Sequence, residues 1–311
     1  IGVAAGQVTI TADGRIENSG TVSGQQTTLA ANTVANTGVI DGQTTRIDAA
    51  TLDNTGSGRI YGDQISIGAT TVNNVASGGA APVIAGRERV DIGAQTINNR
   101  EHGLIYSGGD MAIGGGLDAQ GRATGQADTL NNASATVEAT GNLDLSVRTI
   151  TNSDEHLLTP QVEISSEQIH EFRGDGDQDT YTAGQIGWVP HDQSADLVTP
   201  EGVYDVWFEY NYNRTVTETQ FLHADPAEIL AGGNLNLHTD LLDNRNSHVI
   251  AGGDITGDTG NIINTSSPGI TIITESGSQA RNSRVKIDDA AHTKSHWEQR
   301  TAPSGYFRVI D

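Results

Sequence analysis

Short apolar segments alternate with polar corners along most of the chain and recur at a nearly constant spacing. The clearest element of the repeat is the tripeptide apolar-x-Asn. In most repeats it is followed by a second tripeptide, apolar-x-Gly, as in Ile40-Asp41-Gly42. A short strand of alternating apolar and polar residues, such as Ile65-Ser66-Ile67, completes the repeat. The asparagines of the first element are Asn18, Asn36, Asn54, Asn74, Asn99, Asn132, Asn152, Asn244 and Asn264. They lie 18, 18, 20, 25, 33, 20, 92 and 20 residues apart, so the base period is 18 to 20 residues with insertions.

Three short strands per repeat, separated by Gly or Asn corners, predict a solenoid of parallel strands. One repeat cannot bury its apolar face alone, whereas stacked repeats pair their strands and pile equivalent Ile, Val and Leu side chains into columns. The nine asparagines are expected to stack as a corner ladder, because Asn tolerates the αL conformation and stacked amides hydrogen-bond along the axis. We therefore predict an all-β fold, a right-handed parallel β-helix of about 20 residues per coil. A β-sandwich, the rival fold, need not repeat the same corner chemistry at this period.

The repeat is interrupted at residues 153–228 by a stretch of different composition. This stretch holds nine of the 14 aromatic residues, and it has 16 acidic residues against two arginines. Between residues 203 and 212 polar and aromatic side chains alternate, which predicts Tyr204 and Tyr210 on one face of a strand and Trp207 on the other. We predict an extra-helical β insertion, either a β-hairpin or a small sheet.

The aromatic residues of the insertion allow two interpretations. They could anchor a partner, because aromatic side chains dominate the energetics of interfaces. They could instead form a small local core. The candidate anchors are Trp188, Tyr204, Trp207 and Tyr210.

The pattern divides the chain into four segments. Residues 1–152 are predicted to form β-helix coils, residues 153–228 the insertion, and residues 229–269 further coils. In residues 270–311 the repeat fades and basic residues become frequent, so this segment is either a cap on the apolar end of the coils or the start of a next module. Because the chain opens within the repeat, we expect it to be part of a longer protein.

Charge and composition narrow the classes of function. Acidic residues outnumber basic residues 39 to 17, for a net charge of −22, which disfavours binding to nucleic acid. The absence of cysteine excludes disulfides, zinc–thiolate sites and a thiol nucleophile. No apolar run approaches the ~18 residues of a membrane span.

No motif in the chain indicates a cofactor, a metal or a catalytic centre. Asp175, Asp177 and Asp179 have the spacing of calcium-loop carboxylates, but the Gly and the terminal Glu of such a loop are missing. Arg173-Gly174-Asp175 spells an integrin-recognition tripeptide, for which a solvated loop is the simpler interpretation. No carboxylate pair stands out for glycoside hydrolysis. We predict a non-enzymatic protein without cofactor, with a β-helix enzyme acting on polysaccharides as the remote alternative.

The repeat resembles that of the filamentous haemagglutinin family. The resemblance is carried by the apolar-x-Asn and Ile-x-Gly tripeptides and above all by residues 225–235, whose Ile229-Leu230-Ala231-Gly232-Gly233 returns as Ile250-Ala251-Gly252-Gly253. The stretch 204–219 that precedes this motif is also similar to family members.

The resemblance implies a large exoprotein of two-partner secretion in a Gram-negative bacterium. Such proteins include adhesins and carriers of contact-dependent growth-inhibition toxins. The implied protein is a secreted cell-surface filament, exported through an outer-membrane transporter, in which this chain is a segment of the haemagglutinin-repeat shaft. The alternative is a module that binds a receptor on a target bacterial or host cell through residues 153–228. Neither the family's secretion domain nor its toxin is matched, so the adhesin and the toxin carrier both stay open.

Overall fold

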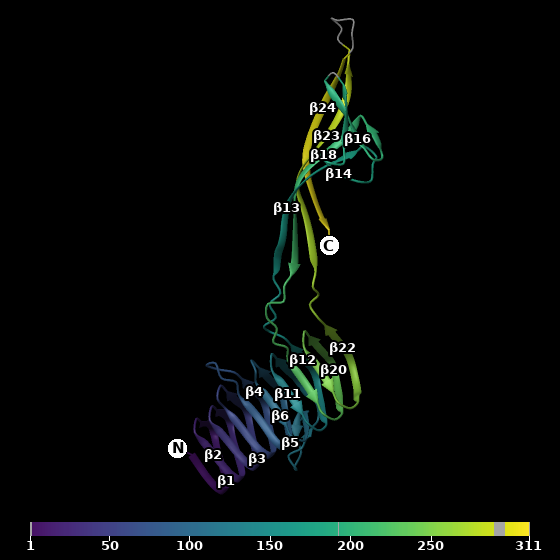
Figure 1. The fold of residues 1–311 in the computed structure, drawn as a ribbon. Helices are drawn as coiled ribbons and strands as arrows, with labels where there is room; N and C mark the ends of the chain where they lie inside the picture. Colours follow the sequence, from purple (N-terminus) through teal and green to yellow (C-terminus); the bar gives the residue numbers. More distant parts are fainter. Residues whose placement is uncertain (1, 192, 289–295, 311) are drawn as a thin grey trace. The chain divides into compact units, whose positions relative to one another are not determined.

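The structure, a computed structural model, describes residues 2–191, 193–288 and 296–310, and its regular elements are β-strands (Figure 1). The chain divides into two compact units. The first, which we call the solenoid, comprises Ile1–Leu158 and Leu222–Ser267; the second, the antiparallel unit, comprises Thr159–Phe221 and Pro268–Asp311.

The solenoid is a stack of coils whose strands pair in parallel along the order β1-β2-β3-β4-β5-β10-β12-β20-β22. In the first coils each strand runs through most of a coil: β1 Gly2–Asn18, β2 Thr21–Asn36, β3 Val39–Thr55, β4 Arg59–Val75 and β5 Val83–Arg100. Later coils are divided into shorter strands: β6 Leu104–Ser107, β7 Asp110–Gly114, β10 Ala127–Ala133, β11 Thr136–Ala139, β12 Leu143–Ser153, β19 Glu228–Ala231, β20 Leu235–Arg245, β21 His248–Ala251 and β22 Ile255–Thr265. The predicted all-β parallel β-helix is confirmed.

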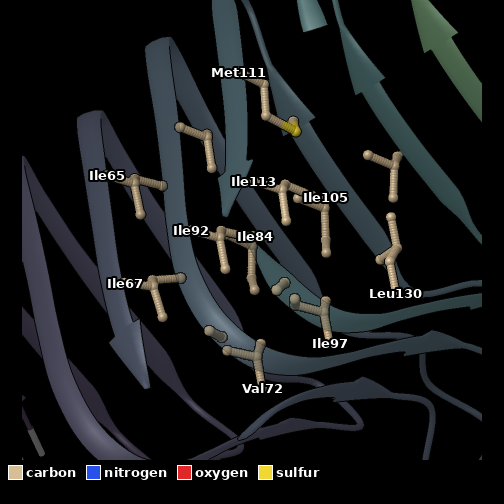
Figure 2. Close-up of a cluster of buried hydrophobic side chains, with 14 of the residues drawn as sticks. Ile65, Ile67, Val72, Ile84, Ile92, Ile97, Ile105, Met111, Ile113 and Leu130 are labelled. Carbon is tan, nitrogen blue, oxygen red and sulfur yellow. The ribbon is translucent and has the colours of Figure 1, made fainter. Parts of the chain in front are cut away.

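The core of the solenoid consists of apolar columns that run from coil to coil. Alternate residues of each strand point inward, and equivalent residues of successive coils stand in register. One column contains Val34, Leu52, Val72, Ile97, Leu130 and Ile150, each at most 1% exposed. Figure 2 shows part of this interior, with Ile65, Ile92 and Ile97 directed into the space that the strands enclose.

The predicted asparagine ladder runs through the whole solenoid. The side-chain Nδ2 of each of the eight asparagines from Asn18 to Asn244 donates to Oδ1 of the next one at 2.8 Å, and the ladder ends at Asn264, which accepts. Several amides also donate to a backbone carbonyl, as Asn54 does to Val83. A row of buried amides is thereby satisfied, which removes the cost of burying polar groups at this corner.

One insertion within the solenoid folds back onto the coils. Two short strands, β8 Gly116–Leu117 and β9 Ala123–Thr124, form a small hairpin between β7 and β10. The buried carboxylate of Asp91 holds this hairpin, because it accepts hydrogen bonds from Arg122 and from the backbone of Ala123 as well as from Arg89. The excursion is thus a packed surface element.

The antiparallel unit contains two sheets. Its five-stranded sheet has the order β14-β13-β18-β23-β24 and all of its pairs are antiparallel. The strands are β13 Gln161–Gly174, β14 Tyr181–Thr182, β18 Val206–Thr219, β23 Thr271–Ile287 and β24 His296–Ile310. A three-stranded antiparallel sheet is formed by β15 Gly187–His191, β16 Ser194–Thr199 and β17 Gly202–Tyr204.

The strands β23 and β24 share a sheet with the insertion. Strand β23 pairs with β18 along its length, and β24 pairs with β23. The four-segment division at residues 152/153, 228/229 and 269/270 stays a prediction.

Candidate binding site in the antiparallel unit

The five-stranded sheet has two chemically different faces. Successive residues of a strand point to opposite faces, so Phe172 and Trp207 share one side, which we call the tryptophan face. Tyr210, Tyr212 and Tyr306 share the other side, which we call the tyrosine face. The candidate residues from the sequence are therefore distributed over both faces.

The tryptophan face is a small apolar core. Phe172 and Trp207 are each 6% exposed, and they pack with Leu197 of β16, which is fully buried. The ring centroids of Phe172 and Trp207 lie 6.1 Å apart, and Trp207 Nε1 donates to the carbonyl of Ala195 at 3.3 Å. Trp207 is therefore part of a small local core, the second of the two interpretations that the sequence allowed for these aromatic residues.

Trp188 borders this core but remains accessible. Its ring meets Trp207 edge-on with centroids 4.9 Å apart and Phe172 at 5.8 Å, yet the residue is 45% exposed. The next residue, Val189, is 39% exposed. Trp188 is thus an accessible ring at the edge of a packed core, whereas Val189, the next residue of the strand, points to the opposite side.

Tyr204 does not share a face with Tyr210, so the alternation predicted across residues 203–212 is wrong at this point. The strand is interrupted at Asp205, which belongs to neither β17 nor β18, and this break resets the alternation. Tyr204 packs against the core of the tryptophan face. Its ring lies over Gly174, where a Cβ atom would come within 2.4 Å of it.

The tyrosine face joins the insertion to β24. Tyr210 and Tyr212 are 5% and 2% exposed, and the ring of Tyr306 lies 5.3 Å from the first and 5.0 Å from the second. Gly277 of β23 stands between Tyr212 and Tyr306 in the register. A Cβ there would lie 2.8 Å from Tyr212 Cβ, so only glycine lets the two rings meet.

Sequence reasoning missed Tyr306 and Gly277 because the presence of β23 and β24 in the same sheet as the insertion was not expected. The available signal was the extended, aromatic character of Tyr306-Phe307-Arg308-Val309, which is typical of a strand.

Buried charges on the tyrosine face are matched by hydrogen bonds. The carboxylate of Glu275, 1% exposed, accepts from Arg214 at 2.6 Å and from the Tyr306 hydroxyl at 2.7 Å. Burial opposes ionisation of Glu275, but these hydrogen bonds hold its pKa below the ordinary value. Burial, together with a hydrogen bond to Glu171 at 3.0 Å, raises the pKa of the Tyr212 hydroxyl.

Arg173 stands apart from these ion pairs. Its guanidinium carbon lies 5.4 Å from the centroid of Phe208 and 5.7 Å from that of Tyr210. Its Nε is buried without a hydrogen-bond partner. Arg173 and Gly174 end strand β13, and the amide of Asp175 donates to Val206, so the tripeptide does not form the loop expected from the sequence.

A cavity of about 460 Å³ opens on the tyrosine face. Its lining comes from four strands and from the loop after β13: Glu171, Arg173, Gln178, Asp179, Thr180, Tyr210, Tyr212, Gln279, Tyr306 and Arg308. Tyr210 is the sequence-predicted candidate that lines it.

The described ranges hold neither a metal-ligand cluster nor a membrane-spanning helix. No cluster of three or more His, Asp or Glu residues there has a geometry that could hold a metal ion. No helix in the same ranges has the length and apolarity needed to cross a membrane.

Comparison with protein families gives one match. The model of the haemagglutinin repeat matches residues 3–81, 83–169 and 226–288, which together are more than half of the 311 residues. The matched ranges include the strands of the coils and resume shortly before β19. All four candidate anchors lie between the second and third matched ranges. Comparison with curated proteins and with solved structures yields no match.

Proposed function

Because the chain belongs to the haemagglutinin repeat family of filamentous haemagglutinin-type exoproteins, we propose that its solenoid is a shaft segment of a large secreted protein at the cell surface. In this role the coils hold distal domains towards a target cell and display the antiparallel unit. Export would use the outer-membrane transporter of two-partner secretion in a Gram-negative bacterium. The parent protein would be a filamentous adhesin or a contact-dependent toxin-delivery stick, and this segment would have no catalytic activity.

The observation that carries this proposal is the uninterrupted ladder from Asn18 to Asn264. Its eight equal hydrogen bonds connect successive coils, and each coil is also paired through its strands to the next. Stability of such a stack is a sum over repeats and their interfaces. With about 4.8 Å between paired strands, the ladder spans roughly 40 Å. A stack of this kind is suited to holding other domains of a protein at a fixed distance.

The last coil supports the same role, because its interior is uncovered in the described structure. Ile255 and Ile262 are 55% and 59% exposed. Leu242, the neighbour of Ile262 in the preceding coil, is 5% exposed. An apolar end of this kind is stabilised by stacking another coil on it.

Deletion of one whole coil tests the shaft. Removing residues 55–74 joins Asn54 to Val75, which pairs with Thr55 in the present register. We expect this variant to fold, with far-UV circular dichroism and urea denaturation close to those of the parent chain and a solenoid shorter by about 4.8 Å. Deleting residues 65–74 is the matched control, because half a coil destroys the register. If both deletions unfold the chain to the same degree, the coils are not interchangeable shaft units.

A second candidate function is receptor binding by the antiparallel unit. The observation that favours it is the exposure of Trp188 at the edge of a packed core. The test is binding of the labelled 311-residue chain to candidate bacterial and host cells, compared with a Trp188→Ala variant. Phe307→Ala is the control, because Phe307 is an exposed aromatic of the same unit. Loss of binding in the first variant alone would support the receptor module; equal binding by both variants would exclude Trp188 as the anchor.

A further inference from the structure

The five-stranded sheet of the antiparallel unit has an unpaired edge on each side. Strand β24, the last in the order, pairs only with β23 among the described strands. On the other side β14 covers β13 only at Glu171 and Phe172, so residues 161–170 have no strand on their outer side within the described ranges. The unpaired N–H and C=O groups of such an edge are a template on which another strand can pair.

The end of β24 lacks the features that usually protect an edge. Phe307 is 71% exposed and Val309 is 49% exposed, and because they are two residues apart they lie on the same face of the strand. Lysine, proline and β-bulges are the common means of blocking an edge. Residues 305–310 contain neither lysine nor proline, and their register with β23 has no shift. This end of β24 is therefore open to a further strand.

The two free edges carry opposite charges. Residues 161–170 of β13 contain Glu163 and Glu167 and no arginine or lysine, whereas the one charged residue of 305–310 is Arg308. Glu167 and Arg308 are both exposed. Like charges that lie opposite each other in a sheet are destabilising. Pairing of two β13 edges, or of two β24 edges, would bring like charges together, whereas pairing of β13 with β24 brings opposite charges together.

The strand directions favour the same combination. Each of the pairs β13–β18, β18–β23 and β23–β24 is antiparallel, so β13 runs in the direction opposite to β24. A second copy displaced along the sheet, with the rotation that sheet twist adds, brings its β13 antiparallel to β24 of the first copy. The junction then repeats the pairing that the sheet already contains, and both faces of the sheet continue across it.

We infer that a second copy of this chain docks here, with residues 165–170 of its β13 paired to residues 305–310 of β24. In the register that the charges favour, Arg308 lies opposite Glu167 of the second copy. Both belong to the tyrosine face, because Arg308 follows Tyr306 by two residues and Glu167 precedes Glu171 by four. The pairing stops where β14 begins to cover β13.

On the other face the same register covers the exposed side chains of β24. Phe307 lies opposite Gln168 of the second copy, and Val309 lies opposite Ser166. Cross-strand neighbours of this kind are the unit of stabilisation in a sheet. The interaction does not depend on the shaft role of the solenoid, since it uses the antiparallel unit alone.

The geometry also defines the kind of assembly and its strength. Each copy presents one edge of each kind, so the contact is heterologous and can continue beyond a dimer. Six paired residues form a smaller interface than the roughly 1,600 Å² of a standard stable complex. In solution we therefore expect weak association, with a dissociation constant on the order of 1 mM.

Cysteine cross-linking tests the register. The chain contains no cysteine, so a disulfide can form only at introduced positions. Ser166→Cys and Val309→Cys variants of the whole 311-residue chain are mixed in equal amounts at about 1 mM and oxidised mildly. Opposite positions of paired strands are close enough for a disulfide. We expect the mixed 166–309 product, identified by mass spectrometry, to exceed at least about tenfold the mixed product of Val309→Cys with Gln43→Cys, an exposed position of the solenoid.

Charge exchange tests the contact by a second route, sedimentation velocity over a concentration series. Glu167→Arg is expected to weaken self-association about tenfold, and addition of Arg308→Glu to the same chain should restore it. Glu88→Arg is the matched control, because it makes the same change of charge at an exposed position of the solenoid. If the doubly exchanged variant does not fold, as judged by circular dichroism, the cross-linking decides.

Three results would overturn the inference. The first is a 166–309 product no more abundant than the control product. The second is a chain that stays monomeric at about 1 mM. The third is self-association that Glu167→Arg leaves unchanged, which would indicate end-to-end stacking of solenoids.

Discussion

Replacing one asparagine of the ladder should destabilise the solenoid far more than replacing its neighbour in the chain. Asn99 is fully buried. Its Nδ2 donates to Asn132 Oδ1 at 2.8 Å and to the carbonyl of Thr136 at 2.9 Å, and its Oδ1 accepts from Asn74 at 2.8 Å. Asn99→Ala therefore removes three hydrogen bonds at once.

The magnitude follows from which groups lose their partners. Asn74 Nδ2 keeps a second acceptor, the carbonyl of Leu104 at 3.2 Å. The acceptor atoms of Asn132 and Thr136 lose the donor that Asn99 supplied. Each buried polar group left unsatisfied costs about 1–3 kcal/mol, so we expect Asn99→Ala to lower the free energy of unfolding by about 3–5 kcal/mol.

Asn98→Ala is the matched control. Asn98 is the preceding residue and is half-buried, and its side chain donates to Asn73 at 2.9 Å outside the fully buried ladder. Water can replace that contact, so the expected cost is about 1 kcal/mol or less.

Urea denaturation followed by far-UV circular dichroism gives the free energy of unfolding of both variants. Because neighbouring coils stabilise one another, hydrogen exchange of the amides in β5 and β10 should locate the loss to the coils beside residue 99. If the two variants differ by less than about 0.5 kcal/mol, the ladder contributes no more than an ordinary surface amide and the reasoning is refuted.

Three other perturbations test particular contacts. Gly174→Ala places a Cβ 2.4 Å from the ring of Tyr204. We therefore expect the free energy of unfolding to fall by about 1–3 kcal/mol and the near-UV circular dichroism spectrum to change. An unchanged spectrum would show that the ring does not cover this glycine. Ile97→Ala opens a cavity in a fully buried column. It should lower the free energy of unfolding, measured by thermal or urea denaturation, by about 2–5 kcal/mol. A decrease of less than about 1 kcal/mol would contradict the packing of this column. The hydrogen bond to Glu101 raises the pKa of His156, so this contact stabilises the folded chain below the ordinary histidine pKa, and the stabilisation is lost as the pH rises through the raised pKa. NMR titration of Glu101→Gln should therefore show a lower midpoint for His156 than in the parent chain. The small, solvent-screened difference in stability between the parent chain and this variant should be present at pH 5.5 and absent at pH 8.5.

The coils could be predicted from the sequence because each repeats one local rule. An asparagine at the corner and an apolar residue two positions before it recur in every coil, and the stacking of identical positions turns this pattern directly into a register. Asn18 and Asn264 are 246 residues apart in the chain, yet both could be assigned to one ladder from spacing alone. The ladder could also be predicted without knowing how the insertion folds.

The antiparallel unit could not be predicted in the same way because its pairing is non-local. Strand β18 pairs with β23 across the coils of β19 to β22, and no repeat marks this partner. The tyrosine face depends on Tyr306, which appears only once this pairing is known. Tyr204 lies on the tryptophan face because the strand is interrupted at Asp205, and the alternation of residue types in the sequence gives no sign of this interruption.

The place where the chain leaves the solenoid explains how an insertion can be accommodated there. Asn152 and Asn244 are 92 residues apart, yet their hydrogen bond is 2.8 Å long, as are all the others in the ladder, and Ser153 pairs with Arg245 directly after it. The chain departs and returns at a corner between strands, so the coils close over the excursion without a lost ladder bond. Each coil must present its apolar residues and its asparagine in one register, whereas the excursion has no such requirement. The family match stops at residue 169 and resumes at residue 226, within this excursion. Coils constrained to one register, interrupted by a module without that constraint, are an arrangement in which the sequence of the module can change without cost to the stability of the coils.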